Sequence, residues 1–311
     1  MVRLYIIRHA DPDYDTDKGQ GGSLTENGKI EARALGSYLK NEGITHAYSS
    51  PLGRAKLTAA LALVQIPKFS INLQEETSQS VESVQVKSGE EILSNFDVNV
   101  GIEEWSRELS TLRQISHLET YPTRQSKLKA PAIWDFPAPV IRQQLCELNK
   151  GEGNVSGWKE SCPDYSKYKS QLREFSESAD EFLSRHGILK AVGSPNYHLS
   201  KCTATDPQLR HQKIAMFCHG GTGLTLLSHL LSIPLPLVHG GMWLAPSSVT
   251  TILFDEYQSE QEEEIIVTPR AVQIGGTSHL TAAGLRISNS FYEDDFERPV
   301  ELNIIFHEVM R

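Results

Sequence analysis

The sequence predicts an α/β fold in which helices cover both faces of a mostly parallel sheet, a three-layer sandwich. Two observations predict this class. Short apolar runs alternate with helical segments over the first third of the chain, and the same alternation returns after residue 212. Alternating strands and helices are typical of parallel sheets, because a crossover between parallel strands usually contains a helix.

The first third contains four expected elements. They are strand, helix, strand and helix, at residues 3–9, 24–43, 45–50 and 51–64. The first helix has apolar residues at helical spacing and is closed by Gly43, a residue that commonly ends helices. Ser50 is placed to cap the second helix, with Pro51 in its first turn. Residues 68–74 could add a third strand.

The middle of the chain is less regular. Residues 76–205 are rich in Ser, Glu and Gln and contain one clear helical pattern, at 165–187. We expect this range to be a helical and irregular insertion that covers one edge of the sheet, within a single domain spanning 1–311.

The sheet pattern then resumes with a strand, a helix and two further strands, at residues 213–219, 220–233, 247–256 and 264–275. The acidic stretch 257–266 is expected to join the last two strands as a solvated hairpin loop.

Composition limits the classes of function. The 311 residues carry 39 acidic and 30 basic side chains, a net charge of −9. This balance argues against nonspecific nucleic-acid binding, which relies on surplus Lys and Arg. We find no signal peptide and no apolar run of the ~18 residues that a membrane span needs. Four widely spaced cysteines form no metal-finger pattern. We therefore expect a cytoplasmic protein without nucleic-acid or membrane partners, and allow for a homodimer.

Two arginines and two histidines stand where predicted strands end. Arg8 and His9 follow the first strand, Arg54 lies in the first turn after the second, and His219 follows the strand at 213–219. In open α/β sheets, ligands bind beyond the carboxyl ends of the strands. A single histidine at a strand end is more often structural, but three equivalent junctions together favour one pocket for a phosphate dianion.

Four motifs carry a resemblance to a known family. They are LYIIRHA, LTENGKIEARALGSYL, AYSSPLGRAKLTA and FCHGGT, which occur in this order in the chain. Over residues 2–64 and 212–231 the chain resembles the histidine phosphatase superfamily, with its phosphoglycerate mutase-like fold. A weaker similarity continues through IGGTSHL at 274–280.

The resemblance implies a role for each residue of the pocket. His9 would be the nucleophile that takes the phosphoryl group on a ring nitrogen. Arg8, Arg54 and His219 would bind the phosphoryl oxygens and stabilise the charge that develops on them, and Gly220 would also contact the substrate. Covalent catalysis requires the attacking nitrogen to be deprotonated. No cofactor and no metal ion are implied, because these cationic groups supply the charge.

The general acid is expected in the segment GIEEW. The resemblance implies Glu104, and the adjacent Glu103 is a credible substitute. Either carboxyl group could instead lie on the surface before a buried Trp105.

The sequence favours a phosphatase that acts through a phosphohistidine on a small phosphorylated metabolite. Phosphoglycerate mutases carry an N-E-R-x-Y-G stretch and paired arginines, and this chain shows neither. A mutase-type phosphoryl transfer, a phosphotyrosine or phosphohistidine substrate, and a catalytically silent phosphate-binding relative remain alternatives.

A different enzyme class also has a signature here. Asp11 and Asp13 form an Asp-x-Asp pair just beyond a strand, as in magnesium-dependent aspartyl phosphatases. Those enzymes place the first Asp at the strand end itself and need further acids later in the chain. We therefore expect Asp13, Asp15 and Asp17 to form an exposed turn.

Overall fold

The computed structural model describes residues 1–16, 18–67, 69, 100–109, 165–258 and 264–287. The expected strand at 68–74 lies almost entirely outside these residues. Ten strands occur in the described part, in chain order β1 (Arg3–Arg8), β2 (Pro12–Asp13), β3 (Ser23–Leu24), β4 (His46–Ser49), β5 (Gly101–Ile102), β6 (Ile188–Lys190), β7 (Tyr197–Leu199), β8 (Lys213–Cys218), β9 (Val249–Tyr257) and β10 (Ile266–Gly276).

Eight of these strands form one sheet, in the spatial order β5-β4-β8-β1-β9-β10-β7-β6. The first four are parallel to their neighbours, as the sequence predicted. From β1 onward each neighbouring pair is antiparallel. For β9 and β10 the reason is connectivity: only eight residues separate them, so they pair as a hairpin.

Strand β1 lies in the middle of the sheet and is buried on both faces. Leu4 and Ile6 pack into the hydrophobic core on one face, whereas Tyr5 and Ile7 pack into the core on the other. This alternation follows from the two-residue period of a strand. From Leu4 to Arg8 the strand has no solvent-facing residue, which explains its almost continuous apolar run.

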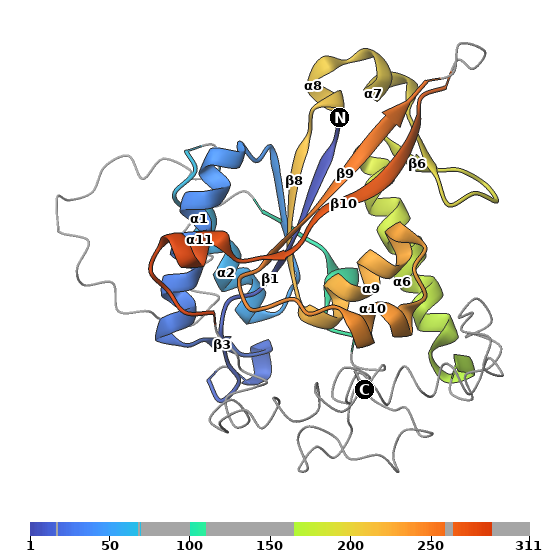
Figure 1. Ribbon diagram of the computed structural model, residues 1–311. Helices are drawn as coiled ribbons and strands as arrows, with labels where there is room; N and C mark the ends of the chain where they lie inside the picture. The colour runs from blue at the N-terminus through green and yellow to red at the C-terminus, as the bar shows by residue number, and fades with distance from the viewer. Residues whose placement is uncertain (17, 68, 70–99, 110–164, 259–263, 288–311) are drawn as a thin grey trace, which may run out of the picture.

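Helices cover both faces of the sheet, which confirms the three-layer fold (Figure 1). On one face lie α1 (Glu26–Glu42), α2 (Gly53–Leu63) and α11 (Ser278–Ala282), and on the other α6 (Tyr165–Arg185), α9 (Gly220–Leu231) and α10 (Leu235–Gly241). The short α7 (Lys201–Thr205) and α8 (Pro207–Arg210) precede β8. No helix of the described residues is long and apolar enough to cross a bilayer.

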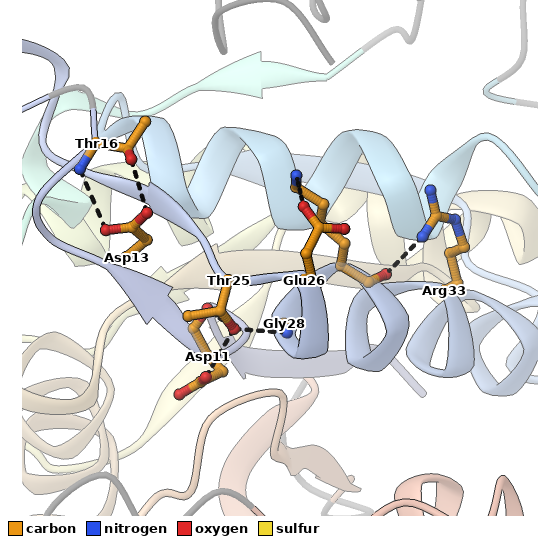
Figure 2. Close-up of polar contacts among 8 residues, drawn as sticks. Asp11, Asp13, Thr16, Thr25, Glu26, Gly28 and Arg33 are labelled. Carbon is orange, nitrogen blue, oxygen red and sulfur yellow. Dashed lines mark hydrogen bonds and ion pairs between the residues drawn. The ribbon is translucent and has the colours of Figure 1, made fainter. Parts of the chain in front are cut away.

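Helix α1 begins and ends as its sequence predicts. The Thr25 hydroxyl accepts a hydrogen bond from the Gly28 N–H at 2.9 Å and donates one to Asp11 at 2.7 Å (Figure 2). Gly43 ends the helix with a φ of 69°, the left-handed conformation that glycine adopts at low cost.

The start of α2 differs from the prediction. Leu52, not Ser50, is the residue that precedes the helix, and no side chain caps it. The Ser50 hydroxyl accepts a hydrogen bond from the Leu52 N–H at 3.3 Å but contacts His219 as well, so this serine belongs to the site described below.

The described parts of residues 76–205 correct our expectation for this range. β5, β6 and β7 join the main sheet, and α6 covers one of its faces. Strands of two or three residues are too short to produce a periodic sequence pattern, so this range appeared to be an insertion. Residues 110–164 lie outside the described part, and a single domain over 1–311 stays a prediction.

The close packing of α1 on α2 depends on Gly36. A methyl group at this position would overlap the backbone carbonyl oxygen of Ala62. We expect Gly36→Ala to lower the free energy of unfolding by about 1–2 kcal/mol, because the overpacking cost exceeds the gain in helix propensity. Urea unfolding measures the change. Gly19→Ala is the matched control, since nothing lies within 4 Å of its added methyl group; an equal loss in both variants would contradict the packing argument.

Candidate active site

The two histidines meet because β1 and β8 are parallel neighbours in register. Arg8 pairs with Cys218, so the next residue of each strand, His9 and His219, emerges at the same point of the carboxyl edge. The His9 N–H donates to the Cys218 carbonyl at 2.9 Å, which continues the ladder by one step. The ring centroids of His9 and His219 lie 5.2 Å apart, and the residues are 1% and 0% exposed.

Arg8 and Arg54 are buried at the same edge, 4% and 7% exposed. Arg8 Nη1 donates to the Leu244 carbonyl at 2.6 Å, and its guanidinium lies 5.0 Å from the centre of the Trp243 ring. Arg54, the second residue of α2, donates to the Gly21 carbonyl and lies 5.4 Å from the centre of the Tyr14 ring. Backbone carbonyls orient both guanidinium groups before any ligand binds.

The hydrogen bond of His9 determines its tautomer. His9 Nδ1 lies 2.8 Å from the Ala10 carbonyl oxygen. A carbonyl can only accept, so Nδ1 carries the proton. The neutral ring then has its lone pair on Nε2, which is the nitrogen available to attack an electrophile.

Ser50 orients the second histidine. Its hydroxyl lies 2.8 Å from His219 Nε2 and already accepts from the Leu52 N–H. The hydroxyl proton is thus available to Nε2, which favours a neutral His219 ring with its proton on Nδ1. Nδ1 is buried and has no hydrogen-bond partner among the described residues, so it can donate to a bound anion.

Burial controls the charge of both rings. It lowers the pKa of His9 well below the usual histidine range, and the neighbouring charges of Arg54 and Arg8 lower it further. The pKa of His219 is lowered well below the usual range by burial first and then by Arg54 and His9. Both histidines are therefore neutral near pH 7, which satisfies the requirement for a nucleophilic imidazole.

Helix α9 adds to the attraction for an anion. His219 precedes its first turn, where unpaired N–H groups carry partial positive charge. Gly220 lies against Arg8: a methyl group at this position would approach Arg8 Nε to 3.4 Å. This contact is consistent with the expected place of Gly220 at the substrate.

Each carboxyl group of the GIEEW segment has a cationic partner. The Glu104 side chain is 71% exposed and pairs with Arg107 at 2.9 Å. Glu103 is buried, but it accepts hydrogen bonds from Arg185 and from the Trp105 ring N–H, each at 2.8 Å. The role of Glu104 as general acid, with Glu103 as substitute, stays a prediction.

A third carboxyl group, that of Glu108, contacts helix α9 next to His219. Its Oε1 accepts a hydrogen bond from the Thr222 N–H in the first turn of α9, at 3.3 Å, and the residue is half-buried. The Thr222 hydroxyl donates to the Arg107 carbonyl at 2.6 Å, which fixes the same segment. Burial lowers the pKa of the Arg8 guanidinium. The nearby Tyr14 and Glu108 side chains raise it.

Four residues at this site were missed or misassigned from the sequence: Tyr14, Ser50, Glu108 and Trp243. The position of Ser50 at the end of a parallel strand could have indicated its role, because the other strand ends carry the site. The others lie in loops, and no local pattern marks them.

The Asp-x-Asp pair serves other purposes. Asp11 accepts from the Thr25 hydroxyl, and Asp13 accepts from the N–H and the hydroxyl of Thr16 (Figure 2). Asp13 also accepts from the Asp15 N–H, which makes a turn in which Asp13 is half-buried and Asp15 is exposed. Among the residues described, no three His, Cys, Asp or Glu side chains gather in an arrangement that could hold a metal ion. Asp17 lies outside the described residues.

Two buried arginines and two buried histidines thus lie at the carboxyl edge of the parallel strands. Among protein-family models, that of the histidine phosphatase superfamily (branch 1) matches residues 4–78, the segment whose motifs predicted this resemblance.

Curated relatives match over a similar range. A probable phosphoglycerate mutase GpmB of Photorhabdus laumondii is 37% identical over 65 residues, which are 20% of this chain and 30% of the relative. The Serratia proteamaculans protein of the same name is 35% identical over 65 residues, with the same coverage. The matched segment therefore spans less than a third of these relatives.

Solved structures resemble the fold over most of the chain. A phosphoserine phosphatase from Entamoeba histolytica, in complex with phosphoserine, aligns with a TM-score of 0.45 and 16% identity, over 90% of this chain and 100% of that one. A mycobacterial glucosyl-3-phosphoglycerate phosphatase aligns with a TM-score of 0.46 and 15% identity, over 88% and 99%. At this similarity the two structures carry no information on the substrate of this chain.

The buried neutral histidines should make the protein less stable in acid. In the unfolded chain a histidine binds a proton below pH ~6.5, whereas His9 and His219 stay neutral in the folded state because their pKa values are lowered. The free energy of unfolding should therefore fall as the pH decreases through ~6.5, by up to about 1.4 kcal/mol per pH unit for each group.

Urea unfolding between pH 7.5 and 5.5 measures this slope. His9→Asn should make it shallower, and the same substitution at the exposed His211 is the matched control for loss of an imidazole. A slope that is identical in wild type and in His9→Asn would show that His9 is protonated in the folded protein.

Proposed function

We propose that this protein is a metal-independent phosphomonoester hydrolase that works through a phosphohistidine intermediate. The observation that carries the proposal is the contact of the His9 and His219 rings, 5.2 Å apart, between two buried arginines. These four groups can surround one PO₃ unit, and His9 offers its unprotonated Nε2 to phosphorus.

In the first step, His9 Nε2 attacks phosphorus, an N–P bond forms and the bond from phosphorus to the ester oxygen breaks. Arg8, Arg54 and His219 Nδ1 donate to the phosphoryl oxygens, where charge builds up. Fixed donors of this kind are usually the largest contribution to catalysis, and one is worth about 3–4 kcal/mol. The Ala10 carbonyl keeps the Nδ1 proton while the ring gains positive charge.

Glu108 is our candidate for the general acid. Its proton goes to the leaving oxygen, which departs as an alcohol. In the second step the Glu108 carboxylate takes a proton from water, the resulting hydroxide attacks phosphorus, and the N–P bond breaks to release inorganic phosphate. Glu108 is then protonated again and the neutral His9 is restored. Its contact with the first turn of α9 supports this assignment over Glu104 and Glu103.

The substrate class is a small phosphorylated metabolite. Hydrolysis is favoured over mutase-type transfer because the chain shows neither the N-E-R-x-Y-G stretch nor the paired arginines expected of mutases. The family match supports phosphoryl chemistry at His9 in general, since it covers residues 4–78 and thus Arg8, His9 and Arg54. The curated relatives named as probable phosphoglycerate mutases agree with this chemistry. A cytoplasmic location and a homodimer stay predictions.

Removing the nucleophile tests the reaction class. Hydrolysis of p-nitrophenyl phosphate should persist in the presence of EDTA and fall by more than about a thousandfold in His9→Ala, because no other group can form the intermediate. His229→Ala is a matched control, since that histidine pairs with Asp180 on α6. Loss of wild-type activity on chelation would point instead to a metal-dependent phosphatase, and phosphate binding without turnover to a silent relative.

Varying the leaving group identifies the general acid. Glu108→Gln should slow the hydrolysis of alkyl phosphates by about 100-fold or more, but that of p-nitrophenyl phosphate by less than about tenfold, because p-nitrophenolate leaves without a proton. Glu104→Gln and Glu103→Gln serve as controls. A selective loss on alkyl phosphates in either control, with Glu108→Gln unaffected, would return the role to the GIEEW segment.

A further inference from the structure

The attacking nitrogen of His9 depends on a single peptide group. The Ala10 carbonyl accepts the Nδ1 proton, so the orientation of the Ala10–Asp11 peptide determines whether Nε2 is free. If this peptide turned, the Ala10 carbonyl would leave Nδ1 and the ring could adopt the other tautomer. The groups that hold the peptide therefore bear directly on nucleophilicity.

The N–H of the same peptide points to Glu31. The Asp11 N–H donates to Glu31 Oε2 at 3.1 Å, which places the Glu31 carboxylate and the His9 ring at opposite ends of one peptide unit. The Ala10 N–H donates to the Thr58 hydroxyl at 3.0 Å, and the Asp11 carbonyl accepts from the Thr25 N–H at 3.1 Å. Glu31 thus supplies a side-chain acceptor for the N–H of the Ala10–Asp11 peptide, and the carbonyl of this peptide accepts the His9 Nδ1 proton.

Glu31 is an unusual residue to find at this depth. It is 0% exposed, and no salt bridge joins it to a cation within the described part of the chain. Three donors surround its two oxygens: the Asp11 N–H and the Ser247 hydroxyl, each at 3.1 Å from Oε2, and the Asn27 side-chain amide at 2.9 Å from Oε1. Burial of a carboxylate without a cationic partner costs free energy, so we expect Glu31 to have a specific role at this position.

The surrounding backbone is shaped to bring Glu31 to this peptide. Gly28, one turn earlier on α1, lies so close to Asp11 that an added methyl group would overlap the Asp11 carbonyl oxygen. On the other side, Ser247 adopts a φ of 59°, a strained value for a serine. In this conformation its N–H donates to the His9 carbonyl at 3.1 Å while its hydroxyl reaches Glu31. Ser247 thus connects the backbone of His9 to the same carboxylate.

We propose that Glu31 is a positioning residue for the nucleophile: its Oε2 holds the Asp11 N–H, and the peptide so oriented keeps the proton of His9 on Nδ1. Glu31 does not touch the phosphoryl group and acts only through the Ala10–Asp11 peptide. This inference rests on the proposed function, in which His9 Nε2 attacks phosphorus. We attribute the effect of Glu31 on the His9 tautomer to the position of its acceptor oxygen Oε2 rather than to its negative charge.

Two conservative substitutions separate position from charge. In Glu31→Gln the amide oxygen can still accept from Asp11 and Ser247, while the Asn27 amide turns to accept from the new NH₂ group. In Glu31→Asp the charge stays, but the side chain is one methylene shorter and its oxygens withdraw from the Asp11 N–H. Glu42→Asp is the matched control, because Glu42 also lies on α1 and accepts a hydrogen bond from β1, from the Tyr5 hydroxyl at 2.8 Å.

Rapid-quench measurement of phosphoenzyme formation gives the first readout. We expect Glu31→Asp to lower the rate constant by about tenfold or more, because small misplacements of a reacting group are costly, with Glu31→Gln and Glu42→Asp within about threefold of wild type. The inhibition constant of inorganic phosphate should change by less than about twofold in all three, because the arginines and His219 are untouched. If Glu31→Asp does not fold, Glu31→Met replaces it.

A second readout does not depend on activity. Nitrogen-15 NMR of histidine-labelled protein reports the tautomer of His9, assigned by the loss of its signals in His9→Asn. Wild type and Glu31→Gln should carry the proton on Nδ1, and Glu31→Asp a mixture of tautomers. A rate and a tautomer equal to wild type in Glu31→Asp would overturn the inference. A lower rate of phosphoenzyme formation in Glu31→Gln, with Glu31→Asp unaffected, would also overturn it, because the effect would then depend on charge. Absence of hydrolysis in wild type, with the tautomer shift present, would overturn the proposed function alone.

Discussion

The parallel pairing of β1 with β8 is the constraint on which the site depends. Its register sets Arg8 opposite Cys218 and thereby brings His9 and His219 together from positions more than two hundred residues apart. A shift of this register by one residue would turn every side chain of β1 to the opposite face of the sheet, so that each would point into the other hydrophobic core. The packing of Leu4, Tyr5, Ile6 and Ile7 into both cores therefore enforces the alignment of the chemistry.

Burial shapes the electrostatics of this edge. Two guanidinium groups and two imidazoles are buried at this edge. Repulsion among them is limited because burial and the arginines lower the pKa of both imidazoles and so favour their neutral form. Carbonyls of Leu244 and Gly21 compensate part of the cost for the arginines. The outcome is a small positive site within a chain of net charge −9, which attracts a dianion locally without making the whole surface basic.

Local sequence predicted the parts of the site that sit directly on strand ends. His9, His219 and Arg54 could be placed because strands and helices of ordinary length flank them, and parallel strands share one edge. The contact of Glu108 with α9 could not be predicted in the same way: β5 has only two residues, so nothing in the sequence indicates where the chain runs after it. The sequence predicted Ser50 as a helix cap because serine is common at that position before a proline. Its contact with His219 depends on the tertiary structure, which local sequence does not indicate.

The strands β6 and β7 were not predicted because each has only three residues. The antiparallel pairing of β9 with β10 follows from the short connection between them.

The segment that carries Glu108 is attached to the molecule by contacts that do not involve the side chains of Arg8, Arg54 and the two histidines. The Glu103 N–H donates to the Ser49 carbonyl, and the Glu103 carboxylate is held by Arg185 at the end of α6. Under the proposed function, changes in this tethered arm would alter proton delivery to the leaving group and leave the cradle formed by Arg8, Arg54 and the two histidines in place.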